Sequence, residues 1–240
     1  MPFQLAIDRG NTKTKVSISG SDGSIVEHFT ITDDHLDTEL HRISGKYSLN
    51  RCILSDVRGQ HFNLPAEWNC IRLSNQLKFP FINAYGTPDT VGHDRLANMA
   101  GAATLFPGEN VLVIDCGTCL TYSLLIQNAF VGGSIAPGIH MRYKALRQFT
   151  GKLPEIDKLG MLPELVGNTT EDSIRSGVEF AVIAETRGMI EAYQEEFGTL
   201  RTVLTGGDYS FFEKYLKSAT FASALLTQIG LHEILRINNV

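Results

Sequence analysis

Two short glycine turns in the sequence carry acidic, hydroxyl and basic side chains at spacings suited to phosphate chemistry. The first turn reads Asp8-Arg9-Gly10-Asn11-Thr12-Lys13-Thr14-Lys15, and the second reads Asp115-Cys116-Gly117-Thr118. A phosphate site needs hydrogen-bond donors close together and little steric bulk, so Gly10 allows close approach while Asn11 and Thr12 donate. Lys15 follows on the returning strand, where its ammonium group can carry positive charge to a phosphate.

Asp8 would repel a phosphate placed directly against it. We therefore expect Asp8 to act through Mg²⁺, which binds one or two carboxylates together with phosphate oxygens. Taken alone, the first turn fits an ordinary Asp-Gly hairpin about equally well. The second turn favours the functional interpretation, because near-identical strand pairs flank both turns, and a carboxylate and a hydroxyl from each half can bind one nucleotide.

A third stretch, Gly92-His93-Asp94-Arg95, precedes an alanine-rich segment, 96–105, that predicts a helix. Asp94 at the start of that helix is either an N-terminal cap, which is the default interpretation, or a general base. Arg95 is suited to binding a carboxylate. A lone histidine such as His93 is more often structural than catalytic.

Two further glycine-rich stretches, 132–138 and 205–208, predict special backbone conformations. The first predicts a tightly specified loop, and the second predicts a strand-to-helix turn. Each stretch either lines a nucleotide pocket or is a plain turn, and the sequence leaves both interpretations open.

The elements that must position these residues form a weak internal repeat. Residues 3–18 read FQLAIDRGNTKTKVSI and residues 111–126 read VLVIDCGTCLTYSLLI. Each copy predicts a buried strand, an Asp-x-Gly turn and an alternating strand. The repeat divides the chain into halves, 1–108 and 109–240, and two similar halves suggest a ligand cleft between them.

The remaining periodicity predicts strands mixed with helices in both halves, which is an α/β class. The predicted strands are 3–8, 13–19, 24–30, 51–56, 111–115, 120–126, 129–131 and 201–205. The predicted helices are 33–43, 96–105, 138–148, 171–197, 210–217 and 222–236. Thr170-Glu171-Asp172 supplies the start signal of the longest helix, because acidic residues stabilise the positive helix end.

Composition excludes several classes of protein. The 240 residues carry 21 Lys+Arg against 26 Asp+Glu, and this net charge of -5 argues against a nucleic-acid partner. Neither a membrane-length apolar run nor a signal-peptide pattern is present, so we expect a cytoplasmic protein without a membrane partner. Of the 4 cysteines, Cys116 and Cys119 form a C-x-x-C pair, interpreted as reduced thiols or, less simply, a redox pair. Walker A and G-x-G-x-x-G patterns are missing.

Together, these motifs resemble those of the type III pantothenate kinase family, within the acetate and sugar kinase, Hsp70 and actin superfamily. The matching pieces are Asp8-x-Gly-Asn-Thr-x-x-Lys15, Gly92-x-Asp-Arg95, Asp115-x-Gly-Thr118, Gly132-Gly-x-Ile-x-Pro-Gly138 and Thr170 through Gly177. The resemblance runs from Asp8 to about Leu235. It implies an α/β fold of two ribonuclease H-like (actin-like ATPase) halves, 1–108 and 109–240, with a nucleotide cleft between them.

The resemblance also implies a reaction, in which ATP phosphorylates the primary hydroxyl of pantothenate to 4′-phosphopantothenate, the first step towards coenzyme A. Asp94 matches the catalytic base. The implied ATP-binding residues are Asp8, Gly10, Asn11, Thr12, Lys15 and Thr118. The implied substrate-binding residues are Tyr85, Gly92, His93, Asp94, Arg95 and Thr170.

Two cations and a partner chain are implied in the same way. Mg²⁺ would accompany ATP and reach Asp8 through the phosphates, and Asp115 matches the ligand of a monovalent cation, K⁺ or NH₄⁺. The resemblance further implies a homodimer with the substrate pocket close to the subunit interface.

Some positions depart from the family pattern, and two other functions stay open. Arg9 replaces a usually apolar residue, where it would contact phosphate or face water, and Thr87 and Cys119 also differ. The alternatives are a non-catalytic regulator on the same scaffold, and a superfamily kinase or phosphatase acting on a sugar, acetate or polyphosphate. Asp94, Lys15 and Asp115 favour an enzyme over the regulator.

Overall fold

The computed structural model describes residues 2–10, 12–32, 35–58, 64–156, 159–160, 162–217 and 221–238. Its contacts divide the chain into two units. Unit 1 consists of Met1–Gly108, Gln127–Gly132 and Leu225–Val240, and unit 2 consists of Glu109–Ile126 and Gly133–Ala224. By these contacts the C-terminal segment groups with unit 1, while the sequence-based domains 1–108 and 109–240 stay a prediction.

Unit 1 contains a five-stranded sheet of order β3-β2-β1-β4-β5. The strands are β1 (Phe3–Arg9), β2 (Thr14–Ser19), β3 (Ile25–Ile31), β4 (Leu49–Asp56) and β5 (Cys70–Arg72). β2 is antiparallel to both β1 and β3, whereas β1, β4 and β5 are parallel. Helix α1 (Leu36–Lys46) packs its apolar residues with those of the sheet and with Trp68 of the short helix η2 (Ala66–Trp68).

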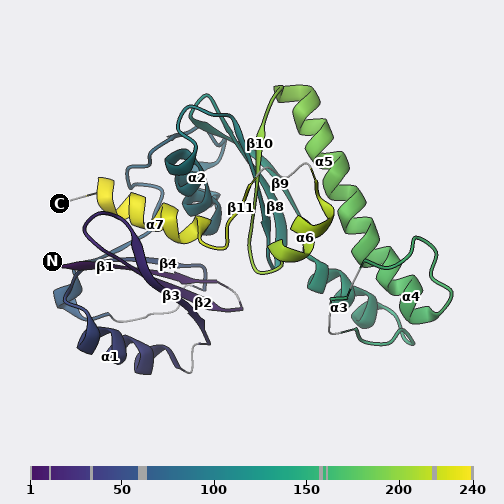
Figure 1. The fold of residues 1–240 in the computed structure, drawn as a ribbon, viewed down its shortest axis with the longest axis horizontal. Coiled ribbons are helices and arrows are strands. Elements are labelled where there is room, and N and C mark those ends of the chain that lie inside the picture. The colour runs from purple at the N-terminus through teal and green to yellow at the C-terminus, as the bar shows by residue number, and fades with distance from the viewer. Residues whose placement is uncertain are drawn as a thin grey trace. The chain divides into compact units, whose positions relative to one another are not determined.

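Two helices far apart in the sequence pack together in unit 1. Helix α7 (Leu226–Ile237) contacts α2 (His93–Leu105) and also β1, β2 and β4 (Figure 1). A Cβ at Gly230 would lie 1.8 Å from the carbonyl oxygen of Ala97, and one at Gly101 would lie 2.3 Å from that of Leu226. Only glycine at these two positions lets the helix backbones approach so closely.

A buried polar cluster joins α7 to β2. His232 Nε2 lies 2.9 Å from Ser17 Oγ, and His232 Nδ1 lies 3.0 Å from Ser19 Oγ. Ser17 Oγ donates to Gln228 Oε1 at 2.5 Å, so it must accept a hydrogen bond from His232 Nε2. Ser19 then donates to Nδ1, which makes the ring neutral. Burial lowers the pKa of His232 to about 4.

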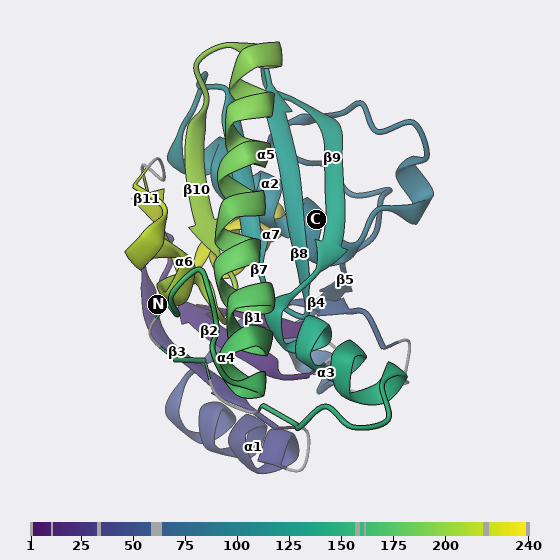
Figure 2. The same ribbon diagram turned by 90° about the vertical axis from the view of Figure 1, so that its right-hand side faces the viewer.

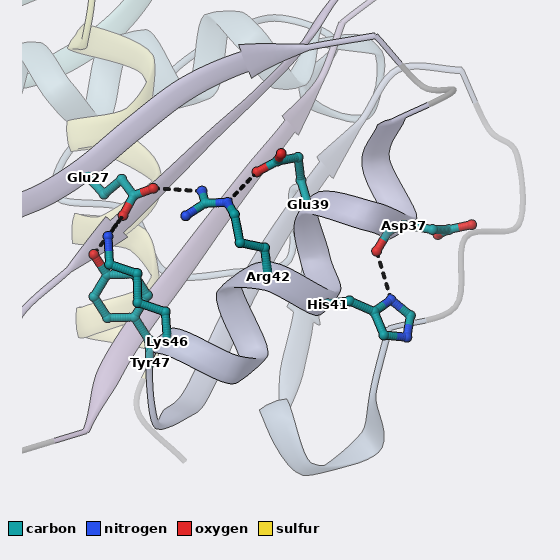
Figure 3. Close-up of polar contacts among 7 residues, drawn as sticks. All are labelled: Glu27, Asp37, Glu39, His41, Arg42, Lys46 and Tyr47. Atoms are coloured by element: carbon teal, nitrogen blue, oxygen red, sulfur yellow. Dashed lines mark hydrogen bonds and ion pairs between the residues drawn. The ribbon is translucent and has the colours of Figure 1, made fainter.

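An exposed ionic cluster attaches α1 to β3 (Figure 3). Glu27 accepts hydrogen bonds from Lys46 Nζ at 2.5 Å, Arg42 Nη2 at 2.6 Å and the Tyr47 hydroxyl at 2.7 Å. These bonds, with that from Lys46 first, lower the pKa of Glu27 to about 2. Because the cluster is largely exposed, its contribution to stability is small.

Unit 2 contains strands of order β11-β10-β7-β8-β9, the same order as in unit 1. They are β7 (Val111–Cys116), β8 (Cys119–Ile126), β9 (Ala129–Pro137), β10 (Arg201–Thr205) and β11 (Phe221–Ala222). As in unit 1, the first strand is antiparallel to the second and parallel to the fourth. The first residues of β9 belong to unit 1, where they pair with β6 (Ile82–Asn83).

The helices of unit 2 cover its sheet. They are α3 (Ile139–Phe149), α4 (Thr170–Arg175), the π-helical turn η4 (Ser176–Phe180), α5 (Ala181–Phe197) and α6 (Tyr209–Tyr215). Figure 2 shows α5 lying along one face of the sheet. Its residues Val182, Ile183 and Ile190 join a core with apolar residues of β7, β8 and β10.

Most predicted elements are confirmed, and the shared strand order confirms the internal repeat. The loop predicted over 132–138 is wrong, because β9 continues to Pro137. The predicted helix over 171–197 is interrupted by η4, and its N-cap is Thr169, whose side chain accepts a hydrogen bond from the Asp172 N–H. Strands β5, β6 and β11 and the short helix η3 (Pro88–Thr90) were not predicted. Within the described ranges, no helix is long and apolar enough to cross a membrane.

Candidate functional site

The first glycine turn places a carboxylate, a hydroxyl and an ammonium group together. Asp8 on β1 lies opposite Lys15 on β2 and beside Ser55 on β4. Ser55 Oγ donates a hydrogen bond of 3.0 Å to Asp8 Oδ1. Directly opposed residues of neighbouring strands share one face of a sheet, so Lys15 projects on the same side as Asp8. The Gly10 N–H closes the turn on the Lys13 carbonyl at 3.1 Å.

The other residues of the first glycine turn lie in different environments. Thr12 is exposed, and Asn11 lies outside the described residues. The expectation that Arg9 faces water is wrong, while contact with a phosphate stays a prediction. The Arg9 side chain is buried, and Nη1 lies 3.1 Å from Asp56 Oδ2 in an ion pair that joins the ends of β1 and β4.

The second turn holds Asp115 in the equivalent position of unit 2. Asp115 on β7 lies opposite Thr121 on β8 and beside Thr205 on β10. A Cβ at Gly206 would lie 2.4 Å from Asp115 Oδ1, so glycine is needed where β10 ends against the carboxylate. The hydroxyl oxygen of Thr205 is buried and has no hydrogen-bond partner among the described residues.

The backbone around Thr118 is also closely packed. The Gly138 N–H donates to the Thr118 carbonyl at 3.1 Å, and a Cβ at Gly138 would lie 2.2 Å from the Gly117 carbonyl oxygen. Thr118 itself is exposed at the tip of the turn. Gly138 therefore supports the second turn, a role that its position after β9 does not reveal in the sequence.

The two turns differ in one residue that matters for charge. In unit 1 the residue opposite the aspartate is the cation Lys15, whereas in unit 2 it is the neutral Thr121. Carboxylate, hydroxyl and carbonyl oxygens are ligands that suit hard cations. The donor set around Asp115 thus fits a bound cation, and the set around Asp8 fits Mg²⁺ shared with phosphate oxygens.

Asp94 lies in the first turn of α2, but it is not the cap. The N-cap position is occupied by Gly92, and no side chain caps this end of the helix. The default interpretation of Asp94 as the cap is therefore wrong. Asp94 Oδ1 accepts a 2.8 Å hydrogen bond from the Arg95 N–H, and a Cβ at Gly92 would lie 2.5 Å from the same oxygen. Gly92 therefore gives the Asp94 carboxylate room at the start of α2.

His93 and Arg95 flank this carboxylate in different environments. His93 is half-buried, and this burial lowers its pKa below the ordinary value. Arg95 is buried, with Nη1 at 3.5 Å from the Tyr85 hydroxyl. Its guanidinium carbon lies 5.4 Å from the ring centre of Tyr85 and 5.2 Å from that of Phe130.

Thr170 is exposed at the start of α4 and lines a cavity of about 530 Å³ in unit 2. The other lining residues are mostly small, polar or aliphatic: Leu146, Leu153, Gly167, Asn168, Thr169, Ser173, Ile174 and Gly177. A second cavity of about 800 Å³, in unit 1, contains none of the predicted site residues.

The structure thus groups Tyr85, Gly92, His93, Asp94 and Arg95 at one end of α2 within unit 1. Sequence reasoning missed two residues near the predicted site: Phe130, which contacts Tyr85 and Arg95, and Ser55, which contacts Asp8. The sequence could have indicated Ser55, because it falls near the end of a predicted strand and parallel strands end at the same edge of a sheet. Phe130 gave no such signal. The 4 cysteines are free thiols.

Three comparisons agree with these observations. The family model for type III pantothenate kinase matches residues 4–192. A type III pantothenate kinase of Phocaeicola vulgatus is 41% identical over 245 residues, covering 99% of each chain. The structure of a Campylobacter jejuni protein described as a Baf family transcriptional activator has a TM-score of 0.64 at 21% identity, covering 97% of each chain. A ROK family glucokinase of Streptomyces griseus, with glucose and AMPPNP, has a TM-score of 0.51 at 10% identity, covering 98% of each chain.

Proposed function

The chain belongs to the type III pantothenate kinase family, and from this premise we propose how its residues carry out ATP-dependent phosphorylation of pantothenate in coenzyme A biosynthesis. The fold is that of actin-like ATPases and sugar kinases. The observation that carries the proposal is the grouping of Asp94 with Arg95 and Tyr85 at the N-terminus of α2.

Asp94 acts as the general base. Its Oδ1 is held by the Arg95 N–H, so the second carboxylate oxygen can face the pantothenate hydroxyl. The hydroxyl oxygen forms the new bond to the γ-phosphorus, its proton passes to Asp94, and ADP leaves with the electrons of the broken P–O bond. Phosphoryl transfer depends mainly on such positioning and on charge stabilisation.

Arg95 binds the pantothenate carboxylate. A guanidinium group presents planar paired donors that match the two oxygens of a carboxylate. Tyr85, Gly92, His93 and Thr170 complete the proposed substrate site. The lowered pKa of His93 favours its neutral form, which contacts a substrate hydroxyl or amide without adding charge.

The residues proposed to bind ATP come from the two glycine turns. They are Asp8, Gly10, Asn11, Thr12, Lys15 and Thr118. Lys15 stabilises negative charge that develops on the γ-phosphate. Bound Mg²⁺ near Asp8 and K⁺ or NH₄⁺ near Asp115 would supply further positive charge at the phosphates. Ser55 holds Asp8 in place for this role.

We further propose that the protein is a cytoplasmic homodimer that uses neither a nucleic acid nor a membrane as a partner. The net charge of -5 supports the exclusion of nucleic acid. Exposed apolar side chains on α3 and the segment before α4, Phe149, Leu165 and Val166, support an association surface in unit 2.

A product assay tests the proposal. The purified protein is incubated with ATP, Mg²⁺ and pantothenate, in K⁺ and in Na⁺, beside the Asp94→Asn variant. We expect 4′-phosphopantothenate that depends on K⁺, with turnover about 10²- to 10⁴-fold lower in the variant. Normal turnover in a folded Asp94→Asn protein would refute the base. A parallel panel of sugars, acetate and polyphosphate tests the alternative substrates.

A further inference from the structure

We propose that Phe130 is a positioning residue for pantothenate binding, because its ring holds the Arg95 guanidinium in the orientation that receives the substrate carboxylate. This inference rests on the proposed function of Arg95. Phe130 does not touch the substrate in this proposal; it acts through Arg95.

The geometry shows that one cation packs on two rings. The rings of Tyr85 and Phe130 are stacked, with centres 5.5 Å apart and an angle of 19° between their planes. The guanidinium carbon of Arg95 is almost equally far from both centres, at 5.4 Å and 5.2 Å. Both separations fall within the range of a cation–π interaction.

The backbone fixes Phe130 independently of its ring contacts. Asn83 on β6 is the parallel partner of Phe130 on β9, and the Ala84 N–H donates to the Phe130 carbonyl at 3.1 Å. Gly132 has φ +125, and a Cβ there would lie 3.6 Å from Tyr85 Cε2. The short β6–β9 pairing therefore brings both rings to α2.

This arrangement has a chemical consequence for Arg95. Packing against two neighbouring rings restricts the rotation of the Arg95 side chain, while a guanidinium group has five N–H donors that remain available for hydrogen bonds to a carboxylate. A flexible arginine loses side-chain entropy when it binds a carboxylate, whereas a preoriented one loses less. Phe130 is fully buried, so its ring is itself held in one place.

The test compares Phe130→Leu with Phe81→Leu. Phe81 packs edge-on against Phe130 with ring centres 6.3 Å apart and is nearly as buried, so its removal controls for loss of a ring from this cluster. For Phe130→Leu we expect the KM for pantothenate to rise about 10-fold while the KM for ATP changes less than twofold. Phe81→Leu should leave the ratio of the two KM values unchanged.

A double-mutant cycle with Arg95→Ala separates positioning from general destabilisation. If Phe130 acts through Arg95, Phe130→Leu has no further effect on the pantothenate KM when Arg95 is already alanine. Phe130→Trp, which keeps an aromatic face, should restore part of the affinity. Thermal melting of each variant identifies any that fail to fold. If Phe130→Leu does not fold, the pantothenate KM of Phe130→Trp is compared with that of the wild-type protein instead.

The outcomes are distinct. Equal rises in both KM values, or an undiminished effect in the Arg95→Ala background, would overturn the role of Phe130 and leave the kinase activity standing. A wild-type protein that forms no 4′-phosphopantothenate would overturn the proposed function and this inference with it.

Discussion

Acidification should destabilise unit 1 through His232. In the folded protein burial lowers the pKa of His232 to about 4, from an ordinary value of 6.5. Between these values the unfolded chain binds a proton that the folded chain does not, so the free energy of unfolding falls as the pH falls from 6.5 to 4. Above pH 6.5 this histidine makes no pH-dependent contribution.

The pKa difference sets the size of the effect. At 1.36 kcal/mol per pKa unit, the change from 6.5 to about 4 corresponds to a loss of about 3 kcal/mol. The slope inside the window is about 1.4 kcal/mol per pH unit. Because the ring is almost wholly buried between Ser17 and Ser19, solvent screening reduces this value little.

Urea titrations followed by tryptophan fluorescence measure this loss in unit 1. Trp68 is the only tryptophan of the chain, and it lies in the core of the β1–β4 sheet and α1. The same titrations of a His232→Gln variant give the pH dependence of its free energy of unfolding. Subtracting that dependence from the wild-type one removes the contribution of His93, whose pKa is also lowered. Parallel pH profiles of the two proteins between pH 4 and 6.5, or an NMR titration of His232 near pH 6.5, would refute the reasoning.

Four further predictions concern the site and the helices of unit 1. Arg95→Ala should raise the KM for pantothenate by about 10²-fold and that for ATP little, since a charged hydrogen-bonded pair is lost; equal rises would argue against a carboxylate contact. Asp115→Asn should weaken the activation by K⁺ in steady-state assays, and an unchanged K⁺ response would place the cation elsewhere. Gly230→Ala should destabilise unit 1 by about 3 kcal/mol, because its Cβ would collide with the Ala97 carbonyl. Gly45→Ala on α1, where a Cβ meets nothing within 4 Å, should instead stabilise unit 1 by about 0.5–1 kcal/mol in the same urea titration.

The parts of the fold that could be predicted are those with local causes. Alternating and continuous apolar runs predict β1, β2, β7 and β8, and with them the positions of Asp8 and Asp115 at the strand ends. The matching strand order of the two units follows from the repeat. Alanine-rich composition likewise predicts most of α2, whose first turn carries Asp94.

The parts that could not be predicted depend on contacts between distant residues. Phe130 reaches Arg95 only because β6, a strand of two residues without periodicity, pairs with β9. The buried ion pair of Arg9 with Asp56 needs the parallel register of β1 and β4. The glycines at 132 and 133 suggested a loop, yet Gly133 lies within β9. Glycine is needed at this position because any side chain would collide with the Tyr122 carbonyl.

The place of α7 in unit 1 also determines the order in which the protein can fold during translation. The ribosome makes β1 to β4 early but α7 only after all of unit 2, Glu109–Ile126 and Gly133–Ala224. At about 5–20 residues per second, the sheet of unit 1 waits on the order of ten seconds or more for the helix that covers it. The face of α2 around Gly101, and the Ser17 and Ser19 hydroxyls, lack their α7 partners throughout that interval. The first strands made therefore await the last helix made, and unit 1 is completed only after the whole of unit 2 has been synthesised.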